Sequence, residues 1–232
     1  MRHARIERDS VAHDTLLFRE GIVQGAVRRS VVPAGREQET PPDELRRRID
    51  NLKSGSYIDE IIAAQDSALY RWREKLTTAL RVYVEPTSDV AGWDPSYPDL
   101  ARNAFGEWSE AGFRVRFAFI YDSASADITI RWKDRFPPSE GQRIGVTERI
   151  QTARFFIAVA RIDVANHDST GRLLSNRTVA GILRHEIGHA LGLNHSSDAT
   201  SVMYRESATS TISASDRATL RLLYLLPPGS LR

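Results

Sequence analysis

Hydrophobic residues recur with helical spacing in two long stretches of the chain. In the stretch Asn176 to Leu191, apolar residues three and four positions apart form one stripe, made of Val179, Ile182, Leu183, Ile187, Ala190 and Leu191. Such a stripe is typical of a helix that packs one face on a core. Ser175 and Asn176 both suit its N-cap position. The second stretch, Pro98 to Ala111, has one apolar face and is closed by Gly112.

Alternating or β-branched hydrophobic runs predict five strands. We expect them at Leu80–Glu85, Phe113–Ile120, Ala126–Trp132, Gly145–Gln151 and Phe155–Val164. The last two follow each other closely enough to pair as a hairpin. A final helix opens with Ser213 and Asp216, which are spaced as in a capping box, and it ends before Pro227. The order of these elements predicts a mixed α/β domain.

Residues 1–66 have a weaker pattern, and we interpret them as an N-terminal arm that precedes a main domain of residues 67–232. The stretch Pro33 to Pro42 is rich in Pro, Gly, Glu and Thr, which indicates a linker, and helical spacing follows over Asp43–Leu52 and Tyr57–Leu69. Two interpretations stay open: a pro-segment or regulatory arm over a cleft, and a structural extension on the back of the domain. We expect residues before about Ile61 to be dispensable for building the site.

The composition limits the possible functions. The 232 residues are enough for one domain with an appendage, and the net charge is only +2. The absence of cysteine excludes disulfides, cysteine–zinc sites and a cysteine nucleophile. No basic run is interleaved with aromatic residues, so we expect no nucleic-acid partner. No apolar run approaches the length of a membrane span, so we expect no transmembrane segment.

One motif near the C-terminus concentrates the chemistry of the chain: His185-Glu186-Ile187-Gly188-His189-Ala190-Leu191-Gly192-Leu193-Asn194-His195. His185 and His189 are four residues apart, so on a helix they project from the same face. Gly192 accepts a positive φ, which lets the chain leave the helix and bring His195 in as a third ligand. Three histidine ligands leave one position of a tetrahedral zinc ion open, as in catalytic zinc sites. A helix with purely structural histidines is the weaker alternative, because five motif positions are fixed.

This motif resembles the zinc signature of the metzincin metalloproteases, His-Glu-x-x-His-x-x-Gly-x-x-His followed by a methionine turn. It is most similar to the matrixins, the matrix-metalloprotease-like branch, because Ser196 follows the third histidine. Ser201-Val202-Met203-Tyr204 resembles their Met-turn, and the segment 212–224 is similar to their C-terminal helix. The resemblance covers about the last two-thirds of the chain.

The resemblance implies a zincin-like metzincin fold of the α/β (α+β) class. Its twisted five-stranded mixed sheet would carry an antiparallel edge strand, an active-site helix and a C-terminal helix. The implied edge strand includes Gly145, Val146 and Thr147, whose backbone would bind an extended peptide by strand addition. The loop from Arg205 to Thr211 would form the outer wall of the pocket for the residue after the scissile bond. Matrixins normally have proline at the position of Arg205.

The implied function is a zinc-dependent endopeptidase with a peptide or protein substrate. Glu186 would be the general base, and Met203 would form a hydrophobic floor beneath the histidines. Two alternatives stay open: a zinc-binding peptide-interaction module without turnover, and a zinc amidohydrolase that acts on a non-peptide substrate. The presence of Glu186 argues against the module, because binding alone needs the histidines and no base.

The sequence predicts one catalytic zinc ion per chain. Matrixins usually carry a long loop for structural zinc and calcium, whereas this chain has the short stretch Asp134 to Gly141. The remaining histidines, His3, His13 and His167, are too scattered for a structural zinc site. His167 opens a predicted turn, residues 167–171, and calcium there stays open. Matrixins are usually exported, but the first residues are charged without a hydrophobic signal core. We therefore assign neither a compartment nor an oligomeric state.

Overall fold

The computed structural model describes residues 15–20, 28–30, 40–73, 78–206 and 211–232. The linker predicted at Pro33 to Pro42 lies mostly outside the described residues. Five α-helices are present within the described ranges: α1 (Pro42–Leu52), α2 (Ile58–Ala64), α3 (Tyr97–Ser109), α4 (Asn176–Ala190) and α5 (Ala214–Leu225). Two short 3-10 helices, η1 (Ser123–Ser125) and η2 (Pro138–Glu140), lie in loops.

Eight strands form the main sheet, with the order β2-β1-β8-β9-β7-β5-β6 and with β4 paired to β9 outside this path. Their bounds are β1 (Thr15–Glu20), β2 (Arg28–Ser30), β4 (Arg71–Trp72), β5 (Leu80–Val84), β6 (Phe117–Phe119), β7 (Ile128–Lys133), β8 (Gly145–Gln151) and β9 (Phe156–Ala165). Strands β5, β6, β7 and β9 are parallel, and β8 is antiparallel to β9. A separate pair joins β3 (Ala68–Leu69) to β10 (Gly229–Ser230).

The mixed α/β architecture agrees with the sequence-based prediction, but the expected five-stranded sheet with β8 at its edge is not what the structure has. Strand β1 pairs antiparallel with β8, from Leu17 opposite Ile150 to Glu20 opposite Thr147. An edge strand presents unpaired backbone groups, and β1 satisfies those of β8 over this stretch. The antiparallel direction of β8 was predicted correctly, and its position at the edge was wrong.

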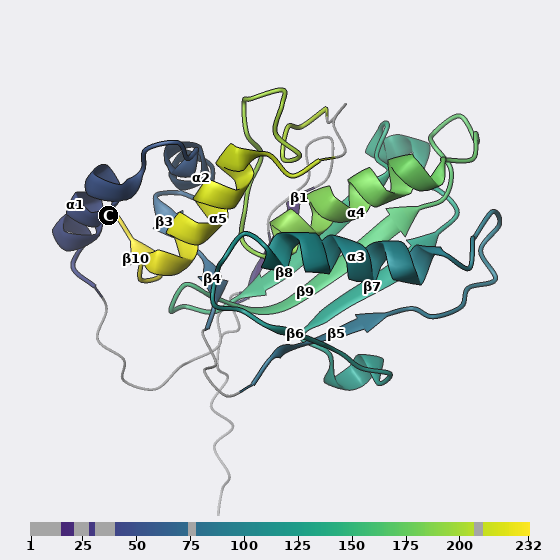
Figure 1. The fold of residues 1–232 in the computed structure, drawn as a ribbon, viewed down its shortest axis with the longest axis horizontal. Coiled ribbons are helices and arrows are strands. Elements are labelled where there is room, and N and C mark those ends of the chain that lie inside the picture. The colour runs from purple at the N-terminus through teal and green to yellow at the C-terminus, as the bar shows by residue number, and fades with distance from the viewer. Residues whose placement is uncertain (1–14, 21–27, 31–39, 74–77, 207–210) are drawn as a thin grey trace, which may run out of the picture.

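Helices α3 and α4 run side by side across one face of the sheet (Figure 1). Their contact is fixed by polar as well as apolar groups. The indole Nε1 of Trp108 on α3 donates to the carbonyl oxygen of Arg184 on α4 at 2.9 Å. The guanidinium of Arg184 makes two bonds, of 2.5 and 2.6 Å, to the carboxylate of Glu107. This contact fixes α4, which carries the histidine motif, against α3.

Helices α1 and α2 belong to the same hydrophobic core as the sheet. Leu45, Ile58 and Ile61 are fully buried in it. Helix α2 is shorter than predicted, since Asp66 and the residue after it take positive φ values of 56° and 65°. A chain cut near Ile61 would lose core side chains, so a start at Thr40 is the better boundary, and it removes only the part of the arm that precedes α1.

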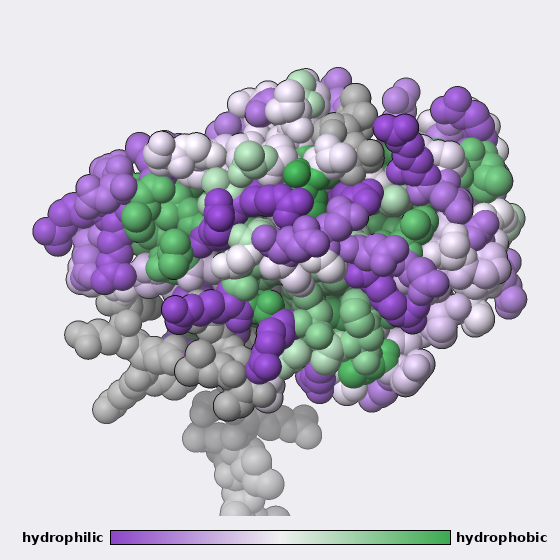
Figure 2. Space-filling model, viewed as in Figure 1, coloured by the Kyte–Doolittle hydropathy of each residue, from purple (hydrophilic) through white to green (hydrophobic). Residues whose placement is uncertain are grey.

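Within the described part of the chain, no helix is long and apolar enough to cross a membrane. Hydrophilic side chains cover much of the face shown in Figure 2, including the band over α3.

Candidate metal centre

The three motif histidines meet at the C-terminal end of α4. His185 and His189 lie on the last turns of the helix, which ends at Ala190. Gly192 then takes a φ of 110°, and a Cβ there would lie 2.6 Å from the carbonyl oxygen of Tyr70. Glycine is therefore required at this turn for conformation and for space. After the turn, His195 faces the other two rings at centroid distances of 5.3 and 4.8 Å.

The end of α4 is a Schellman motif that also orients a histidine. The backbone N–H of Leu193 donates to the carbonyl of Gly188 at 3.0 Å, and that of Gly192 donates to the carbonyl of His189 at 2.9 Å. This turn brings the carbonyl oxygen of Leu193 to 2.9 Å from Nδ1 of His189. A local backbone motif thus fixes the ring of the second histidine.

The hydrogen bonds of His185 and His189 define which nitrogen faces the centre. Nδ1 of His185 lies 2.7 Å from the carbonyl oxygen of Val202, and Nδ1 of His189 has the equivalent contact with Leu193. Carbonyl oxygens only accept, so in both neutral rings the proton is on Nδ1 and the lone pair is on Nε2. The two Nε2 atoms are 3.0 Å apart. Two lone pairs at this distance repel each other unless a cation lies between them.

The geometry of the three histidines fits a metal ion. One ligand atom from each of His185, His189 and His195 lies within 4.8 Å of the others. Two nitrogens on a tetrahedral zinc ion are separated by about 3.3 Å, close to the observed 3.0 Å. The pKa of His189 is lowered to about 3, mainly by burial; the hydrogen bond to the carbonyl of Leu193 opposes this shift, and the charge of Arg149 contributes to it. The ring is therefore neutral at ordinary pH, as metal ligation requires.

Glu186 lies beside the histidines with its carboxylate turned toward β8. Its side chain is buried, and Oε2 accepts a 2.7 Å hydrogen bond from Oγ1 of Thr147. A Cβ placed on Gly145 would lie 2.5 Å from Oε1 and 2.7 Å from the side chain of Ile182. Strand β8 thus binds Oε2 through Thr147. It leaves space for Oε1 at residue 145, because that residue is glycine and has no Cβ.

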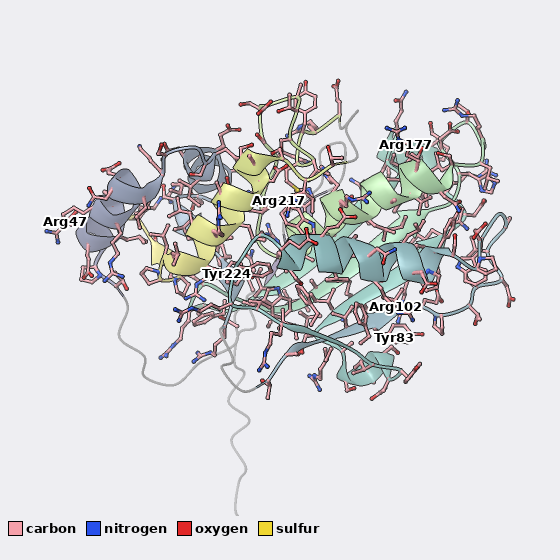
Figure 3. The ribbon with its side chains drawn as sticks, viewed as in Figure 1. Arg47, Tyr83, Arg102, Arg177, Arg217 and Tyr224 are labelled. Carbon is pink, nitrogen blue, oxygen red and sulfur yellow. The ribbon has the colours of Figure 1, made fainter. Side chains whose placement is uncertain are left out.

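Side chains from three other elements donate hydrogen bonds to the last carbonyl groups of α4. Trp72 Nε1 on β4 donates to the carbonyl of Ala190 at 2.8 Å. The hydroxyl of Tyr224, a residue of α5 that is labelled in Figure 3, donates to the carbonyl of Leu191 at 3.0 Å. Arg149 of β8 donates to the carbonyl of His189 at 3.1 Å. These bonds tie the end of α4 that carries the histidines to β4, β8 and α5.

A buried carboxylate holds the predicted Met-turn. Asp216, the fourth residue of the capping box of α5, accepts from the backbone N–H of Val202 at 3.0 Å and from the hydroxyl of Ser201. The neighbouring Met203 is fully buried, and its sulfur lies 2.4 Å from where a Cβ on Gly188 would be. Met203 therefore packs directly against the helix at Gly188, next to His189 in the sequence.

The arm contributes to the same carboxylate. The hydroxyl of Tyr57, just before α2, donates to Oδ1 of Asp216 at 3.2 Å. Burial raises the pKa of Tyr57 well above its ordinary value, and the charge of Asp216 raises it further. Tyr57 is therefore a neutral donor at physiological pH.

The structure separates the predicted substrate-binding residues into two groups. Gly145, Val146 and Thr147 lie on β8 beside Glu186, and their side-chain positions are buried. Arg205 lines a pocket next to His195. Residues 207–210 of the predicted outer wall lie outside the described residues. His167 is remote from the centre and contacts Asp134 at 2.8 Å, in the turn that the sequence predicted.

Three contacts at the site were missed by the sequence analysis. The first two are the bond from Thr147 to Glu186 and the bonds from Asp216 to the Met-turn. The third is the buried amide of Asn194, whose oxygen accepts from Gln65 at 2.7 Å and from Arg149 at 3.1 Å. The Ser213–Asp216 spacing did single out Asp216, but only as a capping residue of the last helix and not as a partner of the Met-turn. Nothing in the local sequence marks the other partners.

A mixed α/β domain whose long helix presents His, Glu and His toward a third histidine is typical of metal-dependent hydrolases. The family model for matrixins matches residues 71–225, which is more than half of the chain. The chain therefore belongs to the matrixin family of zinc metallopeptidases, as its motif predicted. No curated protein matches the chain.

Proposed function

We propose that this protein is a zinc-dependent endopeptidase with His185, His189 and His195 as the metal ligands and Glu186 as the general base. The observation that carries the proposal is the pair of Nε2 atoms 3.0 Å apart, with both Nδ1 atoms directed at carbonyl oxygens. A bound zinc ion would supply the chemistry that this site lacks by itself, since it lowers the pKa of water toward neutrality and polarises a carbonyl group.

In this mechanism Glu186 moves the proton. Its carboxylate takes a proton from the attacking water and delivers it to the amine that leaves, so that one peptide bond is replaced by a carboxylate and an amine. The hydroxyl of Thr147 holds Oε2 by its 2.7 Å bond, and the backbone of Gly145 lies against Oε1. This arrangement restricts the carboxylate to one orientation beside the histidines.

The substrate peptide binds along β8 in an extended conformation. Strand β1 supports this part of the proposal, because it already pairs antiparallel with residues Thr147–Ile150 of β8. Its last residue, Glu20, is opposite Thr147, which contacts the general base. An external peptide must displace β1 to use this stretch. The part of the arm that carries β1 therefore acts as a pro-segment that competes with substrate, which is the first of the two interpretations that the sequence left open. Helices α1 and α2 follow the second interpretation, because they pack in the core of the domain.

The proposal is tested with denatured casein and the full-length protein. We expect zinc-loaded protein to cleave casein, a chelator to stop the cleavage, and added zinc to restore it. The Glu186→Ala variant should bind zinc and leave casein intact. Cleavage that persists in excess chelator would contradict a metal-dependent mechanism. Binding of casein peptides without any cleavage by zinc-loaded protein would favour the interaction module.

A further inference from the structure

A pocket of about 430 Å³ lies directly beside the third histidine. One wall is His195 with Ser197, and a second wall is the segment after the Met-turn, Tyr204 to Glu206. The third wall comes from α2, through Glu60 and Ala64. Helix α2 precedes residues 71–225, so this wall lies outside the part of the chain that the family model matches. In Figure 1, α2 lies next to α5, near the loop that leads into it.

The carboxylate of Glu60 is fixed in the wall of this pocket. Its Oε2 accepts from the backbone N–H of Ser197 at 2.7 Å, and its Oε1 accepts from the hydroxyl of the same residue at 3.0 Å. The helix behind it is anchored to α5, because the backbone N–H of Tyr57 donates to Oγ1 of Thr219 at 3.0 Å. Glu60 is therefore a positioned charge, and its side chain does not have to be ordered when a ligand binds.

The charges and the chemistry of the walls favour a cationic guest. The charged residues that line the pocket are two carboxylates, Glu60 and Glu206, and one guanidinium, Arg205. The remaining side chains next to the metal centre are small or carry hydroxyl groups, as Ser197 and Tyr204 do. A lysine or arginine side chain would find a carboxylate and several hydrogen-bond acceptors there, whereas an acidic side chain would lie against the carboxylates of Glu60 and Glu206.

We propose that this pocket is a substrate subsite for a lysine or arginine side chain close to the scissile bond, and that Glu60 is its specificity-determining residue. The inference rests on the proposed endopeptidase function, since His195 is shared between the pocket and the metal centre. It assigns to α2 a role in choosing the substrate, besides its role in the core.

The test uses full-length protein and peptides that are identical except for one position near the scissile bond, which carries Lys, Gln or Glu. Turnover is measured as kcat/KM for the zinc-loaded protein, and binding is measured by titration of the zinc-loaded Glu186→Ala variant. Both measurements are repeated with Glu60→Gln. Asp59→Asn is the matched control, because Asp59 is the neighbouring carboxylate on α2 and contacts Lys53 on the exposed surface. Competition by β1 weakens all peptides alike, so ratios between peptides remain informative.

We expect one position at which Lys is preferred over Glu by about tenfold, and a fall of this ratio by about fivefold in Glu60→Gln, as for a partly exposed ion pair. Asp59→Asn should keep the ratio of the parent protein. Turnover with a ratio that Glu60→Gln leaves unchanged, or that both variants change equally, would overturn the subsite and leave the endopeptidase intact. Selective binding of the Lys peptide without turnover would support the subsite and contradict the endopeptidase. If the protein showed neither turnover nor selective binding of the Lys peptide, the subsite and the endopeptidase would both be overturned.

Discussion

Replacement of Asp216 by asparagine should weaken both the fold and the metal centre. Asp216 is fully buried, and its two oxygens accept from Ser201, Val202, Ser213 and Tyr57. Two of these donors are backbone N–H groups, from Val202 and Ser213, which cannot turn away. The asparagine oxygen must therefore face them, and its NH₂ group faces the hydroxyls of Ser201 and Tyr57.

The expected cost follows from the bonds that lose their charge. A hydrogen bond to a charged group contributes about 1.5–3 kcal/mol and a neutral one about 0.5–1.5 kcal/mol, so each retained bond weakens by roughly 1 kcal/mol. With some hydroxyl bonds reorganised, the free energy of unfolding should fall by about 2–4 kcal/mol. For a chain of this size that corresponds to a decrease in Tm of about 5–15 °C. Because Val202 also accepts from His185, zinc affinity should fall by about tenfold to a hundredfold.

Thermal unfolding of the metal-free protein measures the first effect, and zinc competition with a chelator measures the second. Asp99→Asn is the control, because the carboxylate of Asp99 is exposed and its described bond is to Arg102. It should change stability by less than about 0.5 kcal/mol. If Asp216→Asn shifted Tm no more than the control and left zinc affinity within twofold, the carboxylate would not be what holds the Met-turn.

Three further predictions concern the arm and the strand beside the site. Because the pKa of Tyr57 is raised in the folded state, the unfolded chain releases this proton first, and stability should decline above about pH 10 by roughly 1.4 kcal/mol per pH unit. Tyr57→Phe should reduce this slope in alkaline denaturation curves, while Tyr97, whose pKa is also raised by burial, keeps part of it; an unchanged slope would contradict the assignment. Gly145→Ala should lower kcat by at least tenfold with zinc retained, because its Cβ would displace the Glu186 carboxylate; normal turnover would show that the strand yields easily. A chain that starts at Thr40 should cleave a generic peptide faster than the full-length chain, because a tethered strand competes at high effective concentration. Equal rates would reject latency and favour a structural arm.

The local signals in the sequence located the elements that carry the motif. The hydrophobic stripe and Ser175 predicted α4, whose N-cap is Ser175, and the Ser213–Asp216 spacing predicted the capping box of α5. Strand β8 has the predicted bounds. Each of these depends on residues that are close in sequence, where periodicity and capping chemistry act directly.

The features that the sequence did not reveal depend on distant partners. Strand β1 pairs with a strand more than a hundred residues later, and the glycines that follow it in the sequence obscured its pattern. Thr147 and Glu186 are 39 positions apart, and they meet only because the sheet places β8 over α4. The burial of Leu45 and Ile58 in the main core was equally hidden, because a short amphipathic helix looks the same whether it packs on its own domain or on a separate arm.

The central claim is that three histidines hold one zinc ion beside a carboxylate that moves the proton. The most direct test measures zinc content and casein cleavage together for the parent protein, Glu186→Ala and His195→Ala. The account predicts one zinc ion per chain in the parent and in Glu186→Ala, with turnover in the latter reduced by about a hundredfold or more. It predicts loss of both zinc and turnover in His195→Ala. Full zinc in His195→Ala, or near-normal cleavage by zinc-loaded Glu186→Ala, would contradict it.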